Sequence, residues 1–468
     1  MQSYTSSQIR SVMVTLLLSI FLGALDQTVI AVALPSIVQD LGDLSLLSWV
    51  VSGYLMSAVV VTPIYGKLSD FYGRRVMLSI ALTIFLLASL ACACAQSMLA
   101  LIIFRIVQGC GGGGLISLSQ ATIAEIIPLR ERGTYQGYIS GAYALASVAG
   151  PVVGGTLTEF FSWRWIFWIN LPLTLIAIGL AYQSLKIIPV RHTRRKIDFA
   201  GIFALTFTLI SFLFAATLLG KAGSLSPLIV SLFCLSLFGL WLFIRIERVA
   251  IEPVIPLALF KIKECSVGMT VLFINFMQVV CVSVFIPLQL QAHASATTSE
   301  AALRLLPLTI SVPIGAFIAG RLISKTGRYR PQQLIGAVVA GISILLYAWT
   351  PVDLLGLGIA LLLLAGLGMG AQFPTTLVGI QHAVPKEHLG IATATTALFR
   401  TLGATVGIAI LSCIYLRLLP AVDNSLAIAP ATARDDGSFI IIFSLIALPS
   451  ILAIHLLRRL DNPTLHTH

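Results

Sequence analysis

The chain alternates between long apolar runs and short polar segments. Fourteen runs hold the roughly 20 apolar residues that a helix needs to cross a bilayer. Their centres lie near Leu18, Tyr54, Ile84, Val107, Leu145, Leu175, Leu209, Leu235, Phe276, Val312, Leu345, Leu364, Gly403 and Ile446. In 468 residues, so many runs leave only short connections. The pattern predicts an all-α polytopic membrane protein with fourteen transmembrane helices and no room for a soluble catalytic domain.

The composition agrees with this pattern. Hydrophobic residues make up 58% of the chain and charged residues 10%, against roughly half and a quarter in soluble domains. The mean hydropathy of +0.99 indicates that the solvent for most of the chain is lipid. The first run continues through Asp26 to Pro35 without a small-residue cleavage site, so we interpret it as an uncleaved helix rather than a signal peptide.

A formal net charge of +11 is also found in proteins that bind nucleic acid, so the positions of the basic residues decide its meaning. If the N-terminus is cytoplasmic, most of the 29 Lys and Arg residues fall in connections on the cytoplasmic side, as the positive-inside rule requires. Clear examples are the segments Lys67–Arg75, Arg191–Lys196 and Arg321–Arg330. We predict a multi-pass protein of the cytoplasmic (inner) membrane with both termini in the cytoplasm and no nucleic-acid partner.

The residues that usually carry catalysis do not form recognisable motifs. The seven cysteines are odd in number and lack the paired spacing of metal ligands. Neither a phosphate-binding glycine loop nor a Ser/His/Asp arrangement with supporting context is found in the sequence. We therefore expect no metal, no cofactor and no enzymatic activity.

A mostly cationic segment bounded by glycines follows the second apolar run and is partly repeated after the tenth. The first copy runs from Gly66 to Arg75 and the second from Gly320 to Arg328; in both, a second glycine stands seven residues after the first and precedes an arginine. Each copy follows the second helix of its half if two helices are inserted between the halves. We predict an N-terminal six-helix bundle over residues 1–190, a linker with two extra transmembrane helices over 191–264, and a C-terminal six-helix bundle over 265–468.

Five strings occur in a fixed order along the first half of the chain. They are Leu25-Asp26-Gln27-Thr28-Val29-Ile30-Ala31-Val32-Ala33-Leu34-Pro35, the Gly66–Arg75 segment, Arg105-Ile106-Val107-Gln108-Gly109 with the glycines 111–114, Gly150-Pro151-Val152-Val153-Gly154-Gly155, and Trp163-Arg164-Trp165-Ile166-Phe167 with Asn170 and Pro172. In this order and spacing they resemble the fourteen-helix drug:proton antiporter family of the major facilitator superfamily. The resemblance covers nearly the whole chain. It implies the major facilitator fold of two six-helix bundles, the two inserted helices and alternating access around a central cavity.

Asp26 is the only acidic residue well inside an apolar run. An ionised group there costs several kcal/mol unless it is paired or faces water, so it is a candidate for function. Counting residues from the outer ends of the first and fourth runs places Asp26 and Arg105 at a similar depth, about 10 to 14 Å below the outer surface. We predict that this pair couples protons to transport, as the matching arginine is implicated to do in the resembled family. The alternative is a structural carboxylate that locks helices together.

Two further motifs are predicted to serve the conformational cycle. A latch is expected in Gly66, Asp70, Gly73, Arg74 and Arg75, with Asp70 at the N-terminus of a neighbouring helix and paired to one of the arginines. The alternative is a basic loop that only sets topology. The second copy has Ser324 in place of Asp70, so the latch should be one-sided. Gly150, Pro151, Gly154 and Gly155 predict close helix packing, and the resembled family associates this string with exporters.

A cavity for amphipathic cargo should be apolar with a few polar groups. The predicted lining residues are Gln108, Trp49, Tyr54, Tyr143, Phe276, Gln278, Phe285, Gln289, Gln372, Phe373 and Arg400. Arg400 can act as a gate or as a packing cation instead of a cargo ligand. One carboxylate against two arginines at bilayer depth argues against a specialist for dications.

Together these features predict a proton-coupled antiporter that exports hydrophobic or amphipathic small molecules, such as drugs and toxic compounds, across the cytoplasmic membrane. Its expected partners are the cargo, protons and the lipid bilayer, and it is expected to be a monomer. The alternatives are an exporter of a lipid or endogenous metabolite by the same mechanism, and a non-transporting membrane receptor or scaffold.

Overall fold

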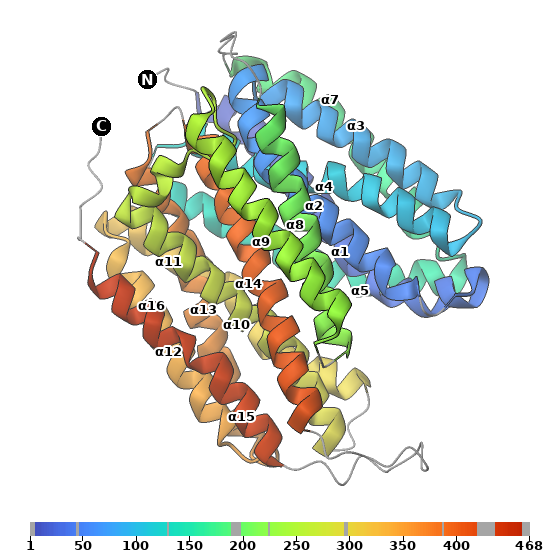
Figure 1. The fold of residues 1–468 in the computed structure, drawn as a ribbon, viewed down its shortest axis with the longest axis vertical. Coiled ribbons are helices and arrows are strands. Elements are labelled where there is room, and N and C mark those ends of the chain that lie inside the picture. The colour runs from blue at the N-terminus through green and yellow to red at the C-terminus, as the bar shows by residue number, and fades with distance from the viewer. Residues whose placement is uncertain are drawn as a thin grey trace.

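The computed structural model describes residues 5–43, 46–128, 131–188, 198–222, 225–293, 298–385, 388–418 and 436–460. Within these ranges the regular structure is helical, without a β-strand (Figure 1). The elements are α1 (Ser6–Leu41), α2 (Leu47–Tyr72), α3 (Arg74–Ala93), α4 (Met98–Ile126), α5 (Arg132–Phe160), α6 (Trp165–Trp168), α7 (Asn170–Ser184), η2 (Leu185–Ile187), α8 (Phe199–Ala222), α9 (Pro227–Val249), η3 (Leu257–Lys261), α10 (Lys263–His293), α11 (Thr298–Thr326), α12 (Arg330–Ala348), α13 (Leu355–Ala383), α14 (Leu389–Leu418), α15 (Asp436–Ala447) and α16 (Pro449–Arg458).

Thirteen helical stretches among the described residues are long and apolar enough to cross a membrane. The α6–α7 pair and the α15–α16 pair each form one of these stretches. The fourteenth predicted span is α5, which has 29 residues and is therefore about 43 Å long. Its hydropathy is lower because Gly, Ser, Thr and Tyr occupy much of it. These residues allow close contacts with neighbouring helices.

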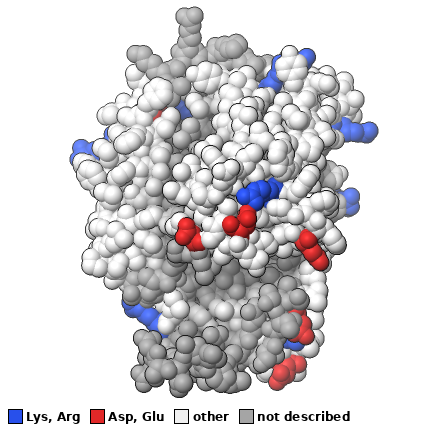
Figure 2. Space-filling view, turned by 90° about the vertical axis from the view of Figure 1, so that its right-hand side faces the viewer, with Lys and Arg blue, Asp and Glu red and all other residues white. Residues whose placement is uncertain are grey.

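Large apolar side chains cover the outside of the bundle. Phe199 and Phe203 on α8 are 73% and 71% exposed, and Leu237 on α9 is 66% exposed. Large parts of the face in Figure 2 carry no Lys, Arg, Asp or Glu. Such a surface is stable against lipid and not against water. The predicted all-α polytopic membrane fold is confirmed.

Alternate connections meet at one end of the molecule. Lys67 at the end of α2 forms a 3.1 Å ion pair with Glu252, which follows α9. Arg330 at the start of α12 donates a 3.0 Å hydrogen bond from Nε to the carbonyl of Leu457 near the end of α16. We call this end the basic end, because the Gly66–Arg75 segment and its second copy both belong to it.

The other connections meet at the opposite end. Asp40, in the last turn of α1, accepts hydrogen bonds from Trp163 Nε1 at 3.0 Å and from Arg164 Nη1 at 2.5 Å. Both donors lie between α5 and α6. Arg164 Nη2 also donates to the carbonyl of Ala95, between α3 and α4, at 3.0 Å. The helices therefore run alternately up and down between the basic end and the opposite end.

Two groups of helices enclose separate hydrophobic cores. The first group is α1–α7, and its core with Leu78 and Phe85 is built mainly from α1–α5 and α7. The second group is α10–α16, and its core with Ile344 and Phe443 is built from α10–α15. Helices α8 and α9, drawn in green, lie between the two groups in Figure 1. A third core, which includes Leu209 of α8, joins α8 and α9 to α2, α10, α13 and α14.

The two groups are in close contact at the basic end. Gly133 of α5 crosses Gly320 of α11 so closely that a Cβ on either glycine would meet the carbonyl oxygen of the other. Beside this crossing, Thr134 Oγ1 lies 2.9 Å from Ser324 Oγ. Gly66 of α2 packs in the same manner against the first turns of α14. These contacts close the basic end between the two groups.

One boundary differs from the sequence prediction. The first span was expected to end near Pro35, but α1 continues to Leu41. Pro35 removes one backbone hydrogen bond, whereas the continuing helix buries Ile37, which is fully covered, in a core with Val50. The domain boundaries after residues 190 and 264 stay a prediction, and the basic stretch Arg191–Lys196 lies outside the described residues.

Closure of the basic end can be tested at the glycine crossing. Gly320→Ala adds one methyl group where α5 leaves no space, and overpacking of this kind costs about 1–3 kcal/mol. The expected result is that disulfide formation between Thr134→Cys and Ser324→Cys, in a background without the seven native cysteines, becomes about tenfold slower.

Gly141→Ala is the matched control for this experiment. Gly141 also belongs to α5, and a Cβ there meets nothing within 4 Å. Cross-linking should proceed at the unmodified rate in this variant. Equal cross-linking in the Gly320→Ala and Gly141→Ala proteins would contradict the closed arrangement.

Candidate functional site

An enclosed ion pair lies between α1 and α4. The apolar surroundings of these helices carry Asp26 and Arg105 into the interior of the first helix group, where their exposed fractions are 4% and 1%. Arg105 Nη1 lies 2.6 Å from Asp26 Oδ2. The two residues therefore lie at the same level, as the residue counts along the first and fourth runs predict. Their role in proton coupling stays a prediction.

Three donors hold the Asp26 carboxylate in place. Besides Arg105, Gln108 Nε2 donates to Asp26 Oδ1 at 2.9 Å and Asn170 Nδ2 donates to the same oxygen at 3.1 Å. Gln108 also donates to Ser89 Oγ at 2.8 Å and accepts from Arg105 Nη1 at 2.7 Å. These contacts join α1, α3, α4 and α7 into one buried polar network around the Asp26 carboxylate.

The rest of the Arg105 side chain is also enclosed. Its Nε donates to the carbonyl of Val50 on α2 at 3.2 Å. The guanidinium carbon lies 4.3 Å from the centre of the Tyr54 ring and 5.9 Å from that of Phe167. Cation–π contacts of this kind stabilise a desolvated arginine. Removing the negative partner would leave this cation buried without a counter-charge.

Two members of the network were not predicted from the sequence. Ser89 and Asn170 are both at most 1% exposed, and neither was assigned a role. Asn170 stands in a string that carried the family resemblance, which was the available indication. Ser89 is one of several serines in apolar runs, and nothing in its sequence context distinguishes it.

The Gly66–Arg75 segment forms a second ionic cluster at the basic end. Arg74 Nη2 lies 2.5 Å from Asp70 Oδ1, and Arg74 Nε lies 3.1 Å from Glu125 Oε2 on α4. Both Asp70 and Arg74 lie directly against Gly390 in the first turn of α14. A carboxylate at that position is favoured by the free N–H groups of the helix start. The structure thus places Asp70 at a helix N-terminus in the other group, as expected.

The remaining members of this segment have distinct surroundings. Gly73, with a φ of +87°, forms the turn between α2 and α3, and a side chain there would be strained. Arg75 does not contact Asp70; its guanidinium lies 4.3 Å from the ring centre of Tyr182. In the second copy, Ser324 contacts Thr134. The latch function of this cluster stays a prediction.

The glycine string of α5 packs against α1. A Cβ on Gly150 would meet Thr28, and one on Gly154 would lie 2.9 Å from the carbonyl oxygen of Val29. Gly155 has looser surroundings, and Pro151 faces outward. Thr28 Oγ1 donates across the contact to the carbonyl of Ala146 at 3.0 Å. Close packing explains Gly150 and Gly154.

Four of the predicted cavity residues come together where the two helix groups meet. The Arg400 guanidinium of α14 lies 4.1 Å from the ring centre of Phe276 on α10 and 4.5 Å from that of Phe373 on α13. Tyr143 of α5 is the polar neighbour of Arg400 from the other group. Trp49 lies apart from them and stacks on Phe214 of α8 at 5.1 Å.

The other predicted cavity residues are packed inside a helix group, which differs from the expected lining role. Gln108 belongs to the Asp26 network, and Tyr54 is covered by Arg105. Gln278 donates to the carbonyl of Ile446 at 2.9 Å and to Ser450 Oγ at 2.7 Å. The remaining three, Phe285, Gln289 and Gln372, are at most 6% exposed. Buried amides need partners, and those of Gln108 and Gln278 find them on neighbouring helices.

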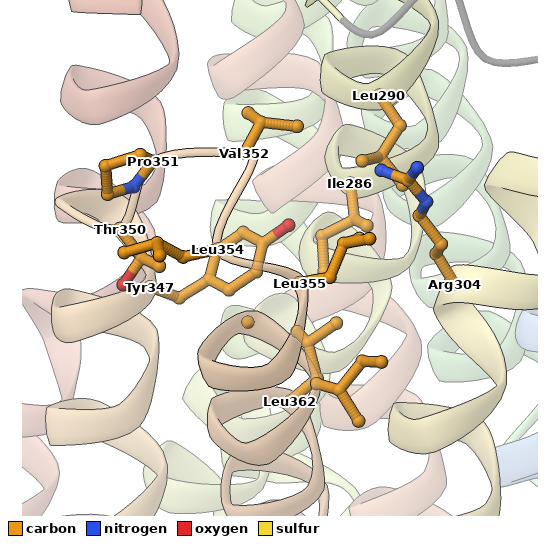
Figure 3. A pocket seen from close by; sticks show the side chains of 12 residues that line it. Ile286, Leu290, Arg304, Tyr347, Thr350, Pro351, Val352, Leu354, Leu355 and Leu362 are labelled. Atoms are coloured by element: carbon orange, nitrogen blue, oxygen red, sulfur yellow. The ribbon is translucent and has the colours of Figure 1, made fainter.

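Two hollows were not predicted. One is an apolar groove of roughly 710 Å³ between α1, α5 and α11, lined by residues such as Leu18, Leu145 and Phe317. The other, at the opposite end, is a pocket of about 30 Å³ with Arg304 and Tyr347 on facing walls (Figure 3). The second pocket has room for about one water molecule. Within the described residues, no group of three or more His, Cys, Asp or Glu is arranged to hold a metal ion.

The fold and the buried ion pair describe a polytopic transporter, and comparison with known proteins places it in a family. The chain belongs to the Major Facilitator Superfamily, whose family model matches residues 16–408. The predicted family membership is thereby confirmed. This family and fold are those of a transporter rather than of an enzyme.

Curated relatives are named as drug transporters and efflux pumps. The multidrug transporter protein MdtP of Bacillus subtilis (strain 168) is 34% identical over 438 residues, which cover 89% of this chain and 80% of the relative. The efflux pump dotC of Dothistroma septosporum (strain NZE10 / CBS 128990) is 33% identical over 457 residues, covering 92% and 77%. Among solved structures, the proton:xylose symporter XylE bound to 6-bromo-6-deoxy-D-glucose superimposes with a TM-score of 0.68 at 18% identity, covering 99% and 98% of the two chains. The last similarity shows the fold.

The ion pair makes a prediction about stability. Asp26→Asn and Arg105→Gln should each lower the melting temperature of the purified protein by several degrees, because removing one partner of a buried pair costs about 3–5 kcal/mol. The double variant removes both charges and should recover most of that loss. Melting temperatures of all four proteins, measured side by side, form the test. Additive losses in the double variant would show that the two side chains do not depend on each other.

The hinge cluster makes a separate prediction. Asp70→Asn removes the charge that pairs with Arg74 and faces the start of α14, so it should slow transport several-fold while cargo affinity stays within about twofold. Initial transport rates and equilibrium binding of the same cargo separate the two quantities. Asp40→Asn, at the exposed ion pair of the opposite end, is the control and should affect neither. A variant that transports at the original maximal rate but binds cargo weakly would argue against a latch.

Proposed function

We propose that this protein is a proton-coupled antiporter that exports hydrophobic or amphipathic small molecules across the cytoplasmic membrane. The observation that carries the proposal is the ion pair of Asp26 and Arg105, buried inside a chain whose relatives are named efflux pumps. A titratable carboxylate in a membrane interior marks proton or ion pathways. The expected location is the inner membrane, with the basic end and both termini in the cytoplasm and the protein acting as a monomer.

Alternating access follows from the contacts at the basic end. With that end cytoplasmic, the structure is closed toward the cytoplasm, because the Gly133–Gly320 crossing and the Asp70–Arg74 cluster are both in contact. Opening toward the cytoplasm requires these contacts to separate as the helix groups 1–190 and 265–468 rock against each other. The glycine crossing has no side chains to repack, so its separation costs little apolar contact.

Proton loading on Asp26 supplies the switch. The ionised carboxylate accepts three hydrogen bonds and pairs with Arg105. Protonation removes the charge attraction and one acceptor position, so the interactions that hold Arg105 and Gln108 against Asp26 become weaker. A proton taken up from outside would favour opening of the basic end. Release of the proton to the cytoplasm would restore the Asp26 network. The basic end would then close again with the cargo bound.

The proposal predicts cargo-dependent proton movement in everted membrane vesicles. With the interior acidified by respiration, addition of a transported dye should raise the interior pH, read with a pH-sensitive fluorophore. The dyes are the anion 8-anilinonaphthalene-1-sulfonate, the neutral N-phenyl-1-naphthylamine and the cation ethidium. The Asp26→Asn/Arg105→Gln double variant keeps the buried charge balanced. It should release at least about tenfold fewer protons from the vesicles.

The Asp40→Asn protein is the control in this assay. It lacks a carboxylate on the same helix, but one whose side chain is 46% exposed, and it should behave like the unmodified chain. Full proton release by the Asp26→Asn/Arg105→Gln protein would sink the coupling role of Asp26. Transport of a dye without proton release would contradict antiport and would indicate that export uses another energy source.

A further inference from the structure

Arg400 is a half-buried cation without a carboxylate partner among the described residues. Its Nε and Nη1 atoms are covered, and they donate a hydrogen bond to no acceptor within that part of the chain. The described ion pairs involve Lys67, Arg74, Arg105 and Arg164. Arg105 differs in this respect. Its guanidinium donates to a carboxylate, a side-chain amide and a backbone carbonyl of the same chain.

The aromatic surroundings do not compensate for the missing acceptor. Phe276 and Phe373 attract the charge of Arg400 through their ring faces. A ring does not replace the oxygen atoms that the guanidinium N–H donors require. Leaving such donors buried and unmet is costly. The arrangement is therefore suited to an oxygen ligand that comes from outside the chain.

The position of Arg400 fits a cargo path. On α14 it lies ten residues beyond Gly390, at about 15 Å along the axis from the closed contacts of the basic end. Tyr143 lies ten residues beyond Gly133 on α5, at the same height in the other helix group. Residues Phe276, Tyr143 and Arg400 are all partly exposed. The cluster thus lies at the boundary between the groups, on the interior side of the closed basic end.

We propose that Arg400, Tyr143, Phe276 and Phe373 form a subsite for the anionic group of an amphipathic aromatic cargo, with a carboxylate or sulfonate bound to the guanidinium. The anion's oxygen atoms accept charge-assisted hydrogen bonds from Nε and Nη1, so both donors gain a partner. The two phenyl rings contact the flat apolar body beside the anion. The inference deepens the proposed export function by naming its cargo class, and it rests on that function only for the statement that the ligand is transported.

Two dyes with the same aromatic body test the subsite by binding alone. 8-anilinonaphthalene-1-sulfonate carries a sulfonate, whereas N-phenyl-1-naphthylamine lacks it. Equilibrium dialysis against protein in lipid nanodiscs, with empty nanodiscs as the blank, gives both affinities. The unmodified protein should bind the sulfonate at least about tenfold more tightly than the neutral dye. Arg400→Gln should bring the ratio of the two affinities close to one, because binding of the sulfonate dye becomes weaker. Arg400→Lys should keep part of the preference for the sulfonate dye.

The matched control is Arg304→Gln, because Arg304 lies in the same helix group beside the small pocket in Figure 3. This variant should keep the full preference for the sulfonate. Melting temperature supplies a readout that a purely structural arginine would move: Arg400→Gln should melt no lower than the unmodified protein, since it removes an unpaired buried charge.

Three results would overturn the subsite. They are an unmodified protein without preference for the sulfonate, an Arg400→Gln protein that retains it, and an Arg400→Gln protein that no longer folds. The dialysis uses no proton gradient, so its failure is distinct from failure of antiport. The Asp26→Asn/Arg105→Gln protein should keep the preference for the sulfonate even though its proton release is lost.

Discussion

The account depends on one buried ion pair. Asp26 and Arg105 lie 2.6 Å apart in a region where neither would be stable alone, because each is almost completely enclosed. The pair ties α1 to α4, and Gln108 and Asn170 extend it to α3 and α7. A single proton on the carboxylate changes the charge balance of four helices at once.

The architecture around this pair separates two tasks. Glycines carry the contacts that must open and close, since Gly133, Gly320 and Gly66 bring backbones together at the basic end without side chains that interlock. We propose that charged groups carry the contacts that respond to protons or cargo. Arg105 has its hydrogen-bond partners within the protein, whereas Nε and Nη1 of Arg400 have none among the described residues. In this proposal the same residue type serves coupling at one site and recognition at another.

Sequence patterns predicted the helices and the Asp26–Arg105 contact. They did not predict the full polar network around Asp26 or which residues lie at the boundary between the two helix groups. Apolar runs and glycine spacing are one-dimensional properties, and helical rise converts them directly into depth. Which way a side chain points around a helix depends on neighbours distant in the chain. Gln278 and Phe285 were therefore expected to line a cavity and instead face the packed interior. Ser89 was missed because its partner, Gln108, identifies it only in three dimensions.

The most direct test follows the basic end while the proton concentration changes. Spin labels at Thr134 and Ser324, whose hydroxyl oxygens lie 2.9 Å apart here, report the separation of the helix groups by pulsed electron resonance. The distance should be short at alkaline pH and lengthen as the pH falls and Asp26 takes up its proton. The Asp26→Asn/Arg105→Gln protein should show one distribution at every pH. A distance that lengthens on acidification in that variant as well would contradict the account.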